Sequence, residues 1–427
     1  MKIRFVTLGC KLNFAESSAL GKELLLRGHQ RATLNEVPDV CVVNTCSVTD
    51  AADHKDRQAI NQLHRKYPNA TIVVTGCYAQ LQPEQISQID GVDYVLGQNE
   101  KYDIPQLIEE IEKHASIASI QETHTNLQDK IRVAAIREVD DFHGVHSADD
   151  RTRCFIKVQD GCNYFCTYCT IPYARGKSRN PKIEEVVIDA QTALNQGAKE
   201  LIITGVNIGD FGRSTGEQFI DLLRAFDQLD GDYRVRISSC EPNLLTDEII
   251  DFVANSKHFA PHFHIPLQSG SNEVLAIMKR RYTRELFAER VQHIRKVMPH
   301  AFIGVDCMVG VRGETEACWE DYLTFIQGLD VSQLHVFTYS ERANTRMLEL
   351  DLYVVPKAER QRRSKILHAV SEEKTSTFYA QHAGRTAVVL WESKKEGDQM
   401  SGFTDNYIKV YGPYKKEKIN TFEEIVL

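Results

Sequence analysis

The sequence predicts an α/β protein of three parts: an N-terminal doubly wound parallel sheet, a central partial (βα)6 barrel and a small C-terminal all-β barrel. Short Val- and Ile-rich runs alternate with amphipathic segments along residues 1–112 and again along residues 155–337. Such alternation is typical of parallel sheets, whose strands are joined by crossover helices. From residue 386 the pattern changes to short β runs separated by Gly- and Lys-rich turns, which favours an all-β module.

The N-terminal part is expected to span residues 1–115. Its strands are expected at Lys2–Leu8, Val40–Asn44, Thr71–Thr75 and Tyr94–Leu96, and its helices at Glu16–Arg27, Ala51–Arg65 and Ile104–Glu112. Residues 116–150 lose this periodicity and collect polar residues, so they are expected to form a linker with one strand at Ile131–Ile136.

The barrel is expected to span residues 151–375. Its strands are expected at Phe155–Val158, Glu200–Thr204, Tyr233–Ile237, His262–Ile265, Phe302–Val305 and Gln333–Phe337, each followed by a helical segment such as Ile183–Asn195 or Thr283–Val297. Six such units predict an open or partial barrel, with an active site at the C-terminal ends of its strands.

The last part is expected to span residues 376–427, after a charged helix near Lys357–Ser376. Its strands are expected at Thr386–Glu392, Asn406–Tyr411 and Glu424–Leu427. The final strand has barely begun where the chain ends, which leaves open whether this barrel is complete.

Composition excludes several classes of protein. With 427 residues, of which 42% are hydrophobic, the chain can build two to four domains with buried cores, so it is neither disordered nor fibrous. No run reaches the roughly 18 apolar residues of a membrane span, and Met1–Val6 leads into a strand rather than a signal peptide. A cytoplasmic protein without a membrane partner is therefore expected.

Charge and cysteine content narrow the chemistry. The net charge of −8 excludes a wholly basic surface for nucleic acid, so any such site must be a local patch. Eleven Cys residues in a reducing compartment favour metal or redox chemistry over disulfides.

The strongest chemical signal is a run of three cysteines, Cys162, Cys166 and Cys169, just after the first barrel strand. Iron–sulfur clusters are held by Cys thiolates, usually four, so three would leave one iron of a 4Fe-4S cluster open to a small molecule. The alternative is a structural zinc site or a group of core thiols. Zinc needs a fourth ligand, and the nearest candidates, Cys154 and His146, lie on the wrong side of a strand.

Three further cysteines each follow a strand of the N-terminal sheet: Cys10, Cys46 and Cys77. Ligands of open parallel sheets bind outside the carboxyl ends of the strands, so these distant thiols are expected to converge there. The alternative is that three buried thiols happen to end strands. The remaining five, Cys41, Cys154, Cys240, Cys307 and Cys318, are expected to be small core residues.

The spacing Cys-x3-Cys-x2-Cys, with Tyr168 before the third Cys, resembles the radical S-adenosylmethionine superfamily. Asp160-Gly161 before the trio and Ile171-Pro-Tyr-Ala-Arg-Gly176 after it make the sequence most similar to the methylthiotransferases, from Gly9 nearly to the end of the chain. The resemblance implies two 4Fe-4S clusters. The catalytic cluster, on Cys162, Cys166 and Cys169, would bind and cleave S-adenosylmethionine, and the second would lie on Cys10, Cys46 and Cys77.

The resemblance also suggests contacts with S-adenosylmethionine and a branch of the family. Tyr168, Thr204, Gly205, Gln268 and Asp306 are candidate cofactor contacts, although Gln268 and Asp306 could instead belong to capping loops. Gly205–Gly209 and Phe337–Ser340 look most like the branch that methylthiolates carbon 2 of N6-threonylcarbamoyladenosine, next to the anticodon of tRNA. The alternatives are an enzyme for N6-isopentenyladenosine or a ribosomal-protein aspartate, and a non-enzymatic iron–sulfur regulator that binds RNA.

Two loops differ from the sequence motifs that are usual in this family. Val311–Thr315 reads Val-Arg-Gly-Glu-Thr in place of Phe-Pro-Gly-Glu-Thr, and Arg342–Thr345 reads Arg-Ala-Asn-Thr in place of Arg-Pro-Gly-Thr. Neither loop contains a candidate cluster ligand. The changes therefore put loop shape and substrate contact in doubt rather than the class of reaction.

Local basic patches could hold RNA despite the acidic total. Residues 151–182 carry seven Lys and Arg against one acid, and Arg175, Lys177 and Arg179 are the expected RNA contacts there. A second patch contains Lys279, Arg280, Arg281 and Arg284. The alternative for each patch is an ordinary solvated face.

The C-terminal module adds a third patch. Gly402–Val410 resembles the small TRAM barrel, an RNA-binding module, in which Tyr407 and Phe403 could stack on splayed bases. The expected RNA contacts of this module are Tyr407, Lys409, Lys415 and Lys416, with Lys394, Lys395 and Lys418 nearby. The expected partners are a tRNA anticodon stem-loop and an electron donor such as flavodoxin or ferredoxin, and a monomer is expected.

Overall fold

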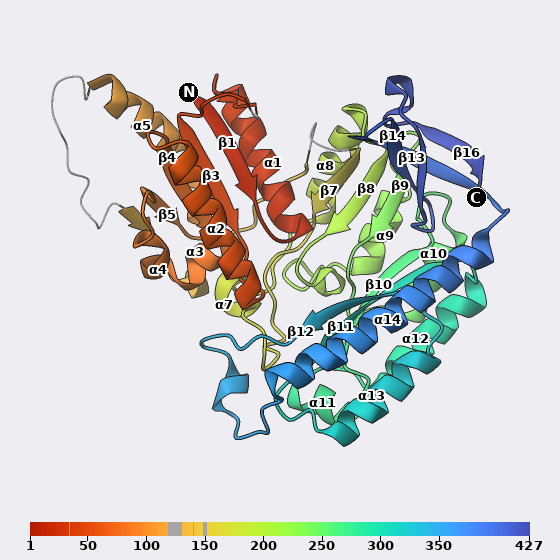
Figure 1. Cartoon of the computed structure of the whole chain (residues 1–427). Coiled ribbons are helices and arrows are strands. Elements are labelled where there is room, and N and C mark those ends of the chain that lie inside the picture. Colours follow the sequence, from red (N-terminus) through yellow and green to blue (C-terminus); the bar gives the residue numbers. More distant parts are fainter. Residues whose placement is uncertain (34, 118–129, 140, 148–151) are drawn as a thin grey trace.

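The computed structural model describes residues 1–33, 35–117, 130–139, 141–147 and 152–427. It contains the three predicted parts, with the N-terminal sheet beside the partial barrel and a small antiparallel sheet at the far side of the barrel (Figure 1). The predicted fold class is therefore confirmed. Residues 118–129, 140 and 148–150 of the expected linker, and Arg151 of the first basic patch, lie outside the described residues.

The N-terminal sheet is parallel throughout, with the order β2-β1-β3-β4-β5-β6. Its strands are β1 (Lys2–Thr7), β2 (Gln30–Arg31), β3 (Val40–Thr45), β4 (Thr71–Gly76), β5 (Tyr94–Leu96) and β6 (Ile131–Arg132). Its helices are α1 (Lys11–Leu26), α2 (Asp50–Lys66), α3 (Cys77–Leu81), α4 (Pro83–Ser87) and α5 (Ile104–Ile117). The two-residue β2 was not predicted, because two exposed polar residues carry no strand pattern.

Helices cover both faces of this sheet, as the doubly wound prediction requires. On one face Ile60 of α2 packs with Val43 and Val74, and on the other Leu20 of α1 packs with Val42. The strands β3 and β4 are buried on both faces, which explains their continuous runs of Val and Ile.

The barrel consists of two three-stranded parallel sheets, β7-β8-β9 and β10-β11-β12, joined by bridges between β9 and the chain around β10. The strands are β7 (Arg153–Lys157), β8 (Glu200–Thr204), β9 (Arg234–Ile237), β10 (His262–Gln268), β11 (Phe302–Val309) and β12 (Gln333–Thr338). The helices are α7 (Ile171–Arg175), α8 (Ile183–Asn195), α9 (Phe219–Phe226), α10 (Asp247–Asn255), α11 (Asn272–Ile277), α12 (Arg284–Val297), α13 (Glu316–Gly328) and α14 (Lys357–His382). Six parallel strands with outer helices confirm the partial barrel.

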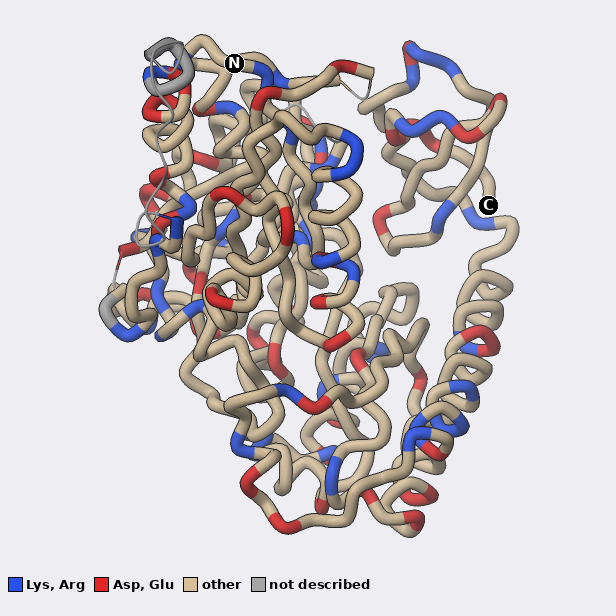
Figure 2. Tube along the Cα trace, turned by 60° about the vertical axis from the view of Figure 1, so that its left-hand side comes forward, with Lys and Arg blue, Asp and Glu red and all other residues tan. Residues whose placement is uncertain are grey.

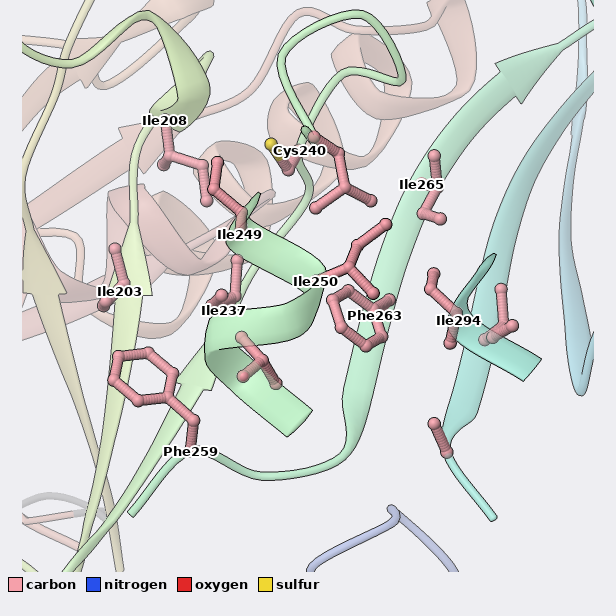
Figure 3. Close-up of a cluster of buried hydrophobic side chains, with 14 of the residues drawn as sticks. Ile203, Ile208, Ile237, Cys240, Ile249, Ile250, Phe259, Phe263, Ile265 and Ile294 are labelled. Carbon is pink, nitrogen blue, oxygen red and sulfur yellow. The ribbon is translucent and has the colours of Figure 1, made fainter. Parts of the chain in front are cut away.

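Branched apolar side chains between the strands and the outer helices form the main core (Figure 3). Ile203, Ile237 and Phe263 from the strands pack with Ile250 of α10 and Ile294 of α12, all of them buried. Burying one such side chain stabilises the fold by about 1.5–3 kcal/mol. This core fixes the ends of the strands, and therefore the loops that begin there.

The C-terminal sheet is antiparallel, with the order β15-β14-β13-β16. Its strands are β13 (Thr386–Glu396), β14 (Gln399–Thr404), β15 (Lys409–Pro413) and β16 (Phe422–Val426). The sequence missed β14, whose residues mix polar, small and apolar types without clear alternation. The predicted boundary at residue 376 falls inside α14, which runs along β12 and then leads into β13 (Figure 1).

Short 3-10 turns complete the described elements: Glu100–Asp103, Ile136–Glu138, Ile208–Asp210, Arg346–Glu349 and Lys416–Lys418. Within the part of the chain that the structure describes, no helix has the length and apolar character needed to cross a membrane.

Candidate active site

The three N-terminal cysteines lie at one edge of their sheet. Cys10 follows β1, Cys46 follows β3 and Cys77 begins α3 directly after β4, and these three strands are neighbours. A Cβ added at Gly9 would lie 2.8 Å from the sulfur of Cys46. Burial, with smaller contributions from the nearby thiols of Cys77 and Cys10, raises the pKa of Cys46 to about 12. The structure therefore brings together the trio that the sequence predicted.

Glycine makes this convergence possible at the end of β4. Gly76 has a φ of +102°, and a Cβ there would lie 2.4 Å from the carbonyl oxygen of Thr45. The backbone turns sharply at Gly76 and places Cys77 at the start of α3, because only glycine adopts this conformation without strain at such a close approach.

The barrel trio lies on the loop that follows β7. Gly161, with a φ of +69°, permits a close approach to Lys177, whose carbonyl oxygen would lie 1.9 Å from an added Cβ. Burial, with a smaller contribution from the Cys166 thiol, raises the pKa of Cys162 to about 11 and that of Cys169 to about 12. The three sulfurs are thus close enough to interact, as the sequence predicted.

The donor sets fit iron–sulfur clusters better than single metal ions. In the described ranges no three His, Cys, Asp or Glu side chains are close enough to hold one ion. A 4Fe-4S cluster binds each thiolate through a different iron, so its ligands lie farther apart than those of zinc. The fourth zinc ligands considered from sequence are engaged elsewhere, since the Cys154 thiol donates to the Ser147 carbonyl at 2.7 Å and His146 faces Asp189 at 3.7 Å.

A cavity of about 190 Å³ lies between the loop that follows β3 and the loop that contains Cys169. One side is formed by Val48 and Thr49, just beyond Cys46, and the other by the loop that contains Cys169. Its lining residues are Val48, Thr49, Tyr168, Cys169, Thr170, Ile171, Gln268, Asp306, Met308, Phe337, Thr338, Tyr339 and Ser340. Residues from both domains therefore enclose one space.

Two buried polar atoms of the lining residues have no hydrogen-bond partner among the described residues. The Gln268 side-chain oxygen and the Tyr339 hydroxyl are buried and make no hydrogen bond with the described chain. Asp306, another lining residue, is paired with His264, because the Oδ1 of Asp306 lies 2.7 Å from the Nε2 of His264. Buried polar groups are normally paired, so these atoms are available to a ligand.

Three of the five candidate cofactor contacts, Tyr168, Gln268 and Asp306, line the cavity. The other two, Thr204 and Gly205, lie at the end of β8 and do not contribute to its described lining. A Cβ at Gly205 would lie 2.8 Å from the carbonyl oxygen of Gln159, so close backbone packing explains this glycine. Their contact with S-adenosylmethionine stays a prediction.

Arg280 is buried against the loop that contains Cys166 and does not lie in the surface patch that the sequence predicted for it. Its side chain is 4% exposed, and its guanidinium donates to the Cys166 sulfur at 3.2 Å and to the Tyr168 hydroxyl at 3.4 Å. It also forms an ion pair with Glu241, which the sequence analysis did not single out. A run of basic residues does not reveal which member points inward.

Arg175 also differs from its predicted role. Only 2% of its side chain is exposed, and it pairs with Glu16 and Asp160, so it does not fit a contact with RNA. Arg179 is 12% exposed and donates to the backbone carbonyls of Asp141 and Arg175. Of the three expected RNA contacts in this patch, Lys177 is exposed and the other two are not. The acids that bind Arg175 come partly from α1, which sequence distance concealed.

Tyr407 and Phe403 of the C-terminal module pack against residues of the barrel. The Tyr407 ring lies 4.8 Å from that of His262 and 4.8 Å from that of Phe403, and the guanidinium of Arg236 sits 4.9 Å above it. Arg153 covers Phe403 at 4.8 Å. Both rings are therefore occupied, which does not fit the predicted stacking on bases.

The lysines of this module are placed differently. Lys415 and Lys416 are exposed, and Lys409 is half-buried with its ammonium 4.7 Å from the centre of the Tyr411 ring. Figure 2 shows Lys and Arg positions spread over the outer strands and turns of the module. Lys418 instead pairs with Glu423 at 2.7 Å.

Comparison with known proteins agrees with this site. The family described as the Radical SAM superfamily matches residues 156–326, and the Uncharacterized protein family UPF0004 matches residues 2–97. The threonylcarbamoyladenosine tRNA methylthiotransferase MtaB of Bacillus subtilis is 35% identical over 96% of this chain and 89% of its own length. The tRNA-2-methylthio-N(6)-dimethylallyladenosine synthase of Desulfitobacterium hafniense is 29% identical over 100% of this chain and 94% of its own length.

A solved structure shares the fold. The radical S-adenosylmethionine methyltransferase TsrM of Kitasatospora setae superposes with a TM-score of 0.59 at 16% identity, covering 81% of this chain and 76% of that one. Matches along almost the whole chain show that this protein belongs to the MtaB family of radical S-adenosylmethionine methylthiotransferases, and the two cysteine trios agree with this family.

Proposed function

We propose that this protein replaces the hydrogen at carbon 2 of N6-threonylcarbamoyladenosine in tRNA, next to the anticodon, with a methylthio group. The observation that carries this proposal is the single cavity lined by residues of both cysteine loops. A reaction that joins a carbon radical to sulfur needs both centres beside one substrate atom, because productive geometry must be held within a few ångströms.

The residues that would hold the cofactors follow from the two trios. Cys162, Cys166 and Cys169 would hold the 4Fe-4S cluster that binds S-adenosylmethionine, and Cys10, Cys46 and Cys77 would hold the second cluster. When bound, these groups supply the 5′-deoxyadenosyl radical and the methylthio group. The family membership supports both clusters.

The chain itself selects and encloses the base. A cavity of about 190 Å³ is smaller than the roughly 300–1,000 Å³ pockets of drug-sized ligands, so it does not admit a stacked loop. The target nucleotide must therefore leave its stack, as it does in other enzymes that modify bases. The unpaired hydroxyl of Tyr339 would hydrogen-bond the base or its N6 substituent, and the unpaired oxygen of Gln268 would meet S-adenosylmethionine.

The protein's own side chains also supply part of the RNA contact. Lys177, Lys415 and Lys416 are exposed and free to meet phosphates, and Lys409 lies on the same module as the last two. The reaction needs an external electron, so a small donor such as flavodoxin or ferredoxin is expected. A monomer suffices, because one chain contributes both trios.

The test is the product formed with two kinds of tRNA. Reduced, reconstituted protein is incubated with S-adenosylmethionine and tRNA bearing either N6-threonylcarbamoyladenosine or N6-isopentenyladenosine, and the nucleosides are measured by mass spectrometry. The proposal predicts a gain of one methylthio group on the first substrate. Product on the second substrate alone would assign the protein to the other branch, and cleavage of S-adenosylmethionine in neither reaction would favour a redox regulator.

A further inference from the structure

A buried network of charged side chains lies between the two cysteine loops. Its members are 0–5% exposed and come from distant elements: Glu16, Lys101, Lys157, Asp160 and Arg175. Burial opposes the ionised form of Glu16, but Arg175 and Lys101 outweigh it and lower the pKa of that carboxyl. Glu16 is therefore ionised at neutral pH, and Arg175 joins it to Asp160.

On the N-terminal side Arg175 reaches the ends of two strands through Asn13. Its Nη2 donates to the Asn13 side-chain oxygen at 2.7 Å. The amide of Asn13 donates in turn to the carbonyls of Leu8, at 2.8 Å, and Thr45, at 3.0 Å. Leu8 lies two residues before Cys10, and Thr45 directly precedes Cys46. One guanidinium thus touches the residue that ties two of the three N-terminal cysteine loops together.

On the barrel side the same guanidinium reaches the other trio through Asp160. Arg175 Nη1 donates to Asp160 Oδ1 at 3.1 Å, and that oxygen also accepts the backbone N–H of Gly161 at 2.8 Å. Gly161 directly precedes Cys162. Arg175 itself ends α7, the short helix that begins two residues after Cys169. A continuous chain of hydrogen bonds therefore links both cysteine loops.

Further contacts converge on the same helix. The helix α3, which begins with Cys77, packs against α7. The Thr170 hydroxyl, next to Cys169, donates to the carbonyl of Ser47, next to Cys46, at 3.3 Å. All three N-terminal cysteine loops thus lie against α7 or bond to its neighbours.

Simple attachment of the two domains does not require this network. Ala15 of α1 packs with Phe155 and Ile202 of the barrel in a buried apolar cluster, which holds the domains together without charges. What the guanidinium adds is direction, because its planar fork binds Asn13, Glu16 and Asp160 in one fixed arrangement.

We propose that Arg175 is a positioning residue that fixes the distance and orientation between the two cysteine loops, and thereby couples cleavage of S-adenosylmethionine to transfer of the methylthio group. The coupling half of this inference rests on the proposed function. The positioning half concerns only the relative placement of the two clusters.

The test compares Arg175→Lys with Arg224→Lys in the reconstituted holoenzyme. Lysine keeps the buried charge but not the fork, so the network loses its fixed geometry. Arg224 is exposed on α9 and pairs only with surface acids, which makes it a matched control. Three quantities are measured: iron content, the ratio of methylthio product to 5′-deoxyadenosine, and the magnetic interaction of the reduced clusters by EPR.

Arg175→Lys is expected to keep its iron and still form 5′-deoxyadenosine, while its product ratio falls at least about tenfold, since a shift of about 1 Å can cost a reaction about a hundredfold. The magnetic interaction between the reduced clusters should weaken or become less uniform in the EPR spectrum. Arg224→Lys should match the parent in iron content, product ratio and EPR spectrum. A parent-like ratio and EPR spectrum in iron-loaded Arg175→Lys would overturn the proposal.

A second variant covers the case in which Arg175→Lys does not fold or loses its iron. Asn13→Ala removes the link to the N-terminal strands and leaves Arg175 paired with Glu16 and Asp160. It should show the same fall in product ratio and the same EPR change. Loss of iron in both variants would also overturn the proposal, because the residues would then serve cluster assembly and not coupling.

The EPR readout separates this inference from the proposed function. If the parent protein forms no methylthio product on its tRNA while Arg175→Lys still changes the cluster interaction, the proposed function fails and the positioning role stands. If the parent forms product and the EPR spectra of parent and variant agree, the positioning role fails alone.

Discussion

The two cysteine trios are built in opposite ways, although residues from loops of both line one cavity. The barrel trio lies within eight consecutive residues on one loop, whereas Cys10, Cys46 and Cys77 come from three strands and are brought together only by the order β1-β3-β4. The first site depends on local loop geometry, and the second depends on the whole N-terminal sheet. Damage to the sheet should therefore impair the N-terminal site before the barrel site.

The largest expected effect comes from removing the barrel trio. Cys162→Ala/Cys166→Ala/Cys169→Ala should abolish formation of both 5′-deoxyadenosine and methylthio product, because no open iron would remain to bind S-adenosylmethionine. Chromatography of reduced reaction mixtures measures both compounds. Residual cleavage above that of protein-free controls would contradict the assignment of the catalytic cluster.

Removing the N-terminal trio should separate the two activities. Cys10→Ala/Cys46→Ala/Cys77→Ala is expected to form 5′-deoxyadenosine but no methylthio product, since the barrel loop keeps all its ligands. Methylthio product from this variant would show that sulfur does not pass through the N-terminal site. Circular dichroism of the variant, compared with the parent, controls for loss of the sheet.

A single methyl group at the end of β4 should act on the N-terminal site alone. Gly76→Ala forces a Cβ to within 2.4 Å of the Thr45 carbonyl oxygen at a φ of +102°, and strain at such positions costs about 1–3 kcal/mol. We expect a lower melting temperature and loss of up to half of the bound iron. Gly384→Ala, with a φ of +77° but open space around it, should cost about 1 kcal/mol and keep all the iron.

The smallest effect concerns binding of tRNA. Lys415→Ala/Lys416→Ala should reduce the slope of log affinity against log salt by up to about two phosphate contacts. Each phosphate that is no longer neutralised means that one counterion fewer is released when the tRNA binds. Arg179→Ala should leave the slope unchanged, since its guanidinium is already bound to backbone carbonyls. Fluorescence anisotropy at several salt concentrations measures both slopes. If only Arg179→Ala changed the slope, the RNA would instead contact the basic patch of residues 151–182.

The sequence predicted the parts of the site that depend on local spacing or on the order of parallel strands. Cys162, Cys166 and Cys169 follow from spacing, and the convergence of the other trio follows from strand ends that share one edge. The position of Arg175 could not be predicted, because its partner Glu16 lies 159 residues away and belongs to another domain.

The C-terminal module shows a related limit. Asp405-Asn406-Tyr407 form a turn with a φ of +66° at Tyr407, so β15 begins only at Lys409. The Tyr407 ring lies against His262 of the barrel. The sequence predicted a strand from Asn406 and a ring exposed to RNA. Period-two patterns indicate strands but do not reveal which neighbouring domain covers an aromatic residue.

The most direct test of two separate cluster sites in one chain is the iron content of the protein after anaerobic reconstitution. With two cluster sites we expect about eight iron atoms per chain, and about half of that number in each triple-cysteine variant. Iron near four in the parent protein, with all of it lost in one triple variant and none in the other, would show that only one trio holds a cluster.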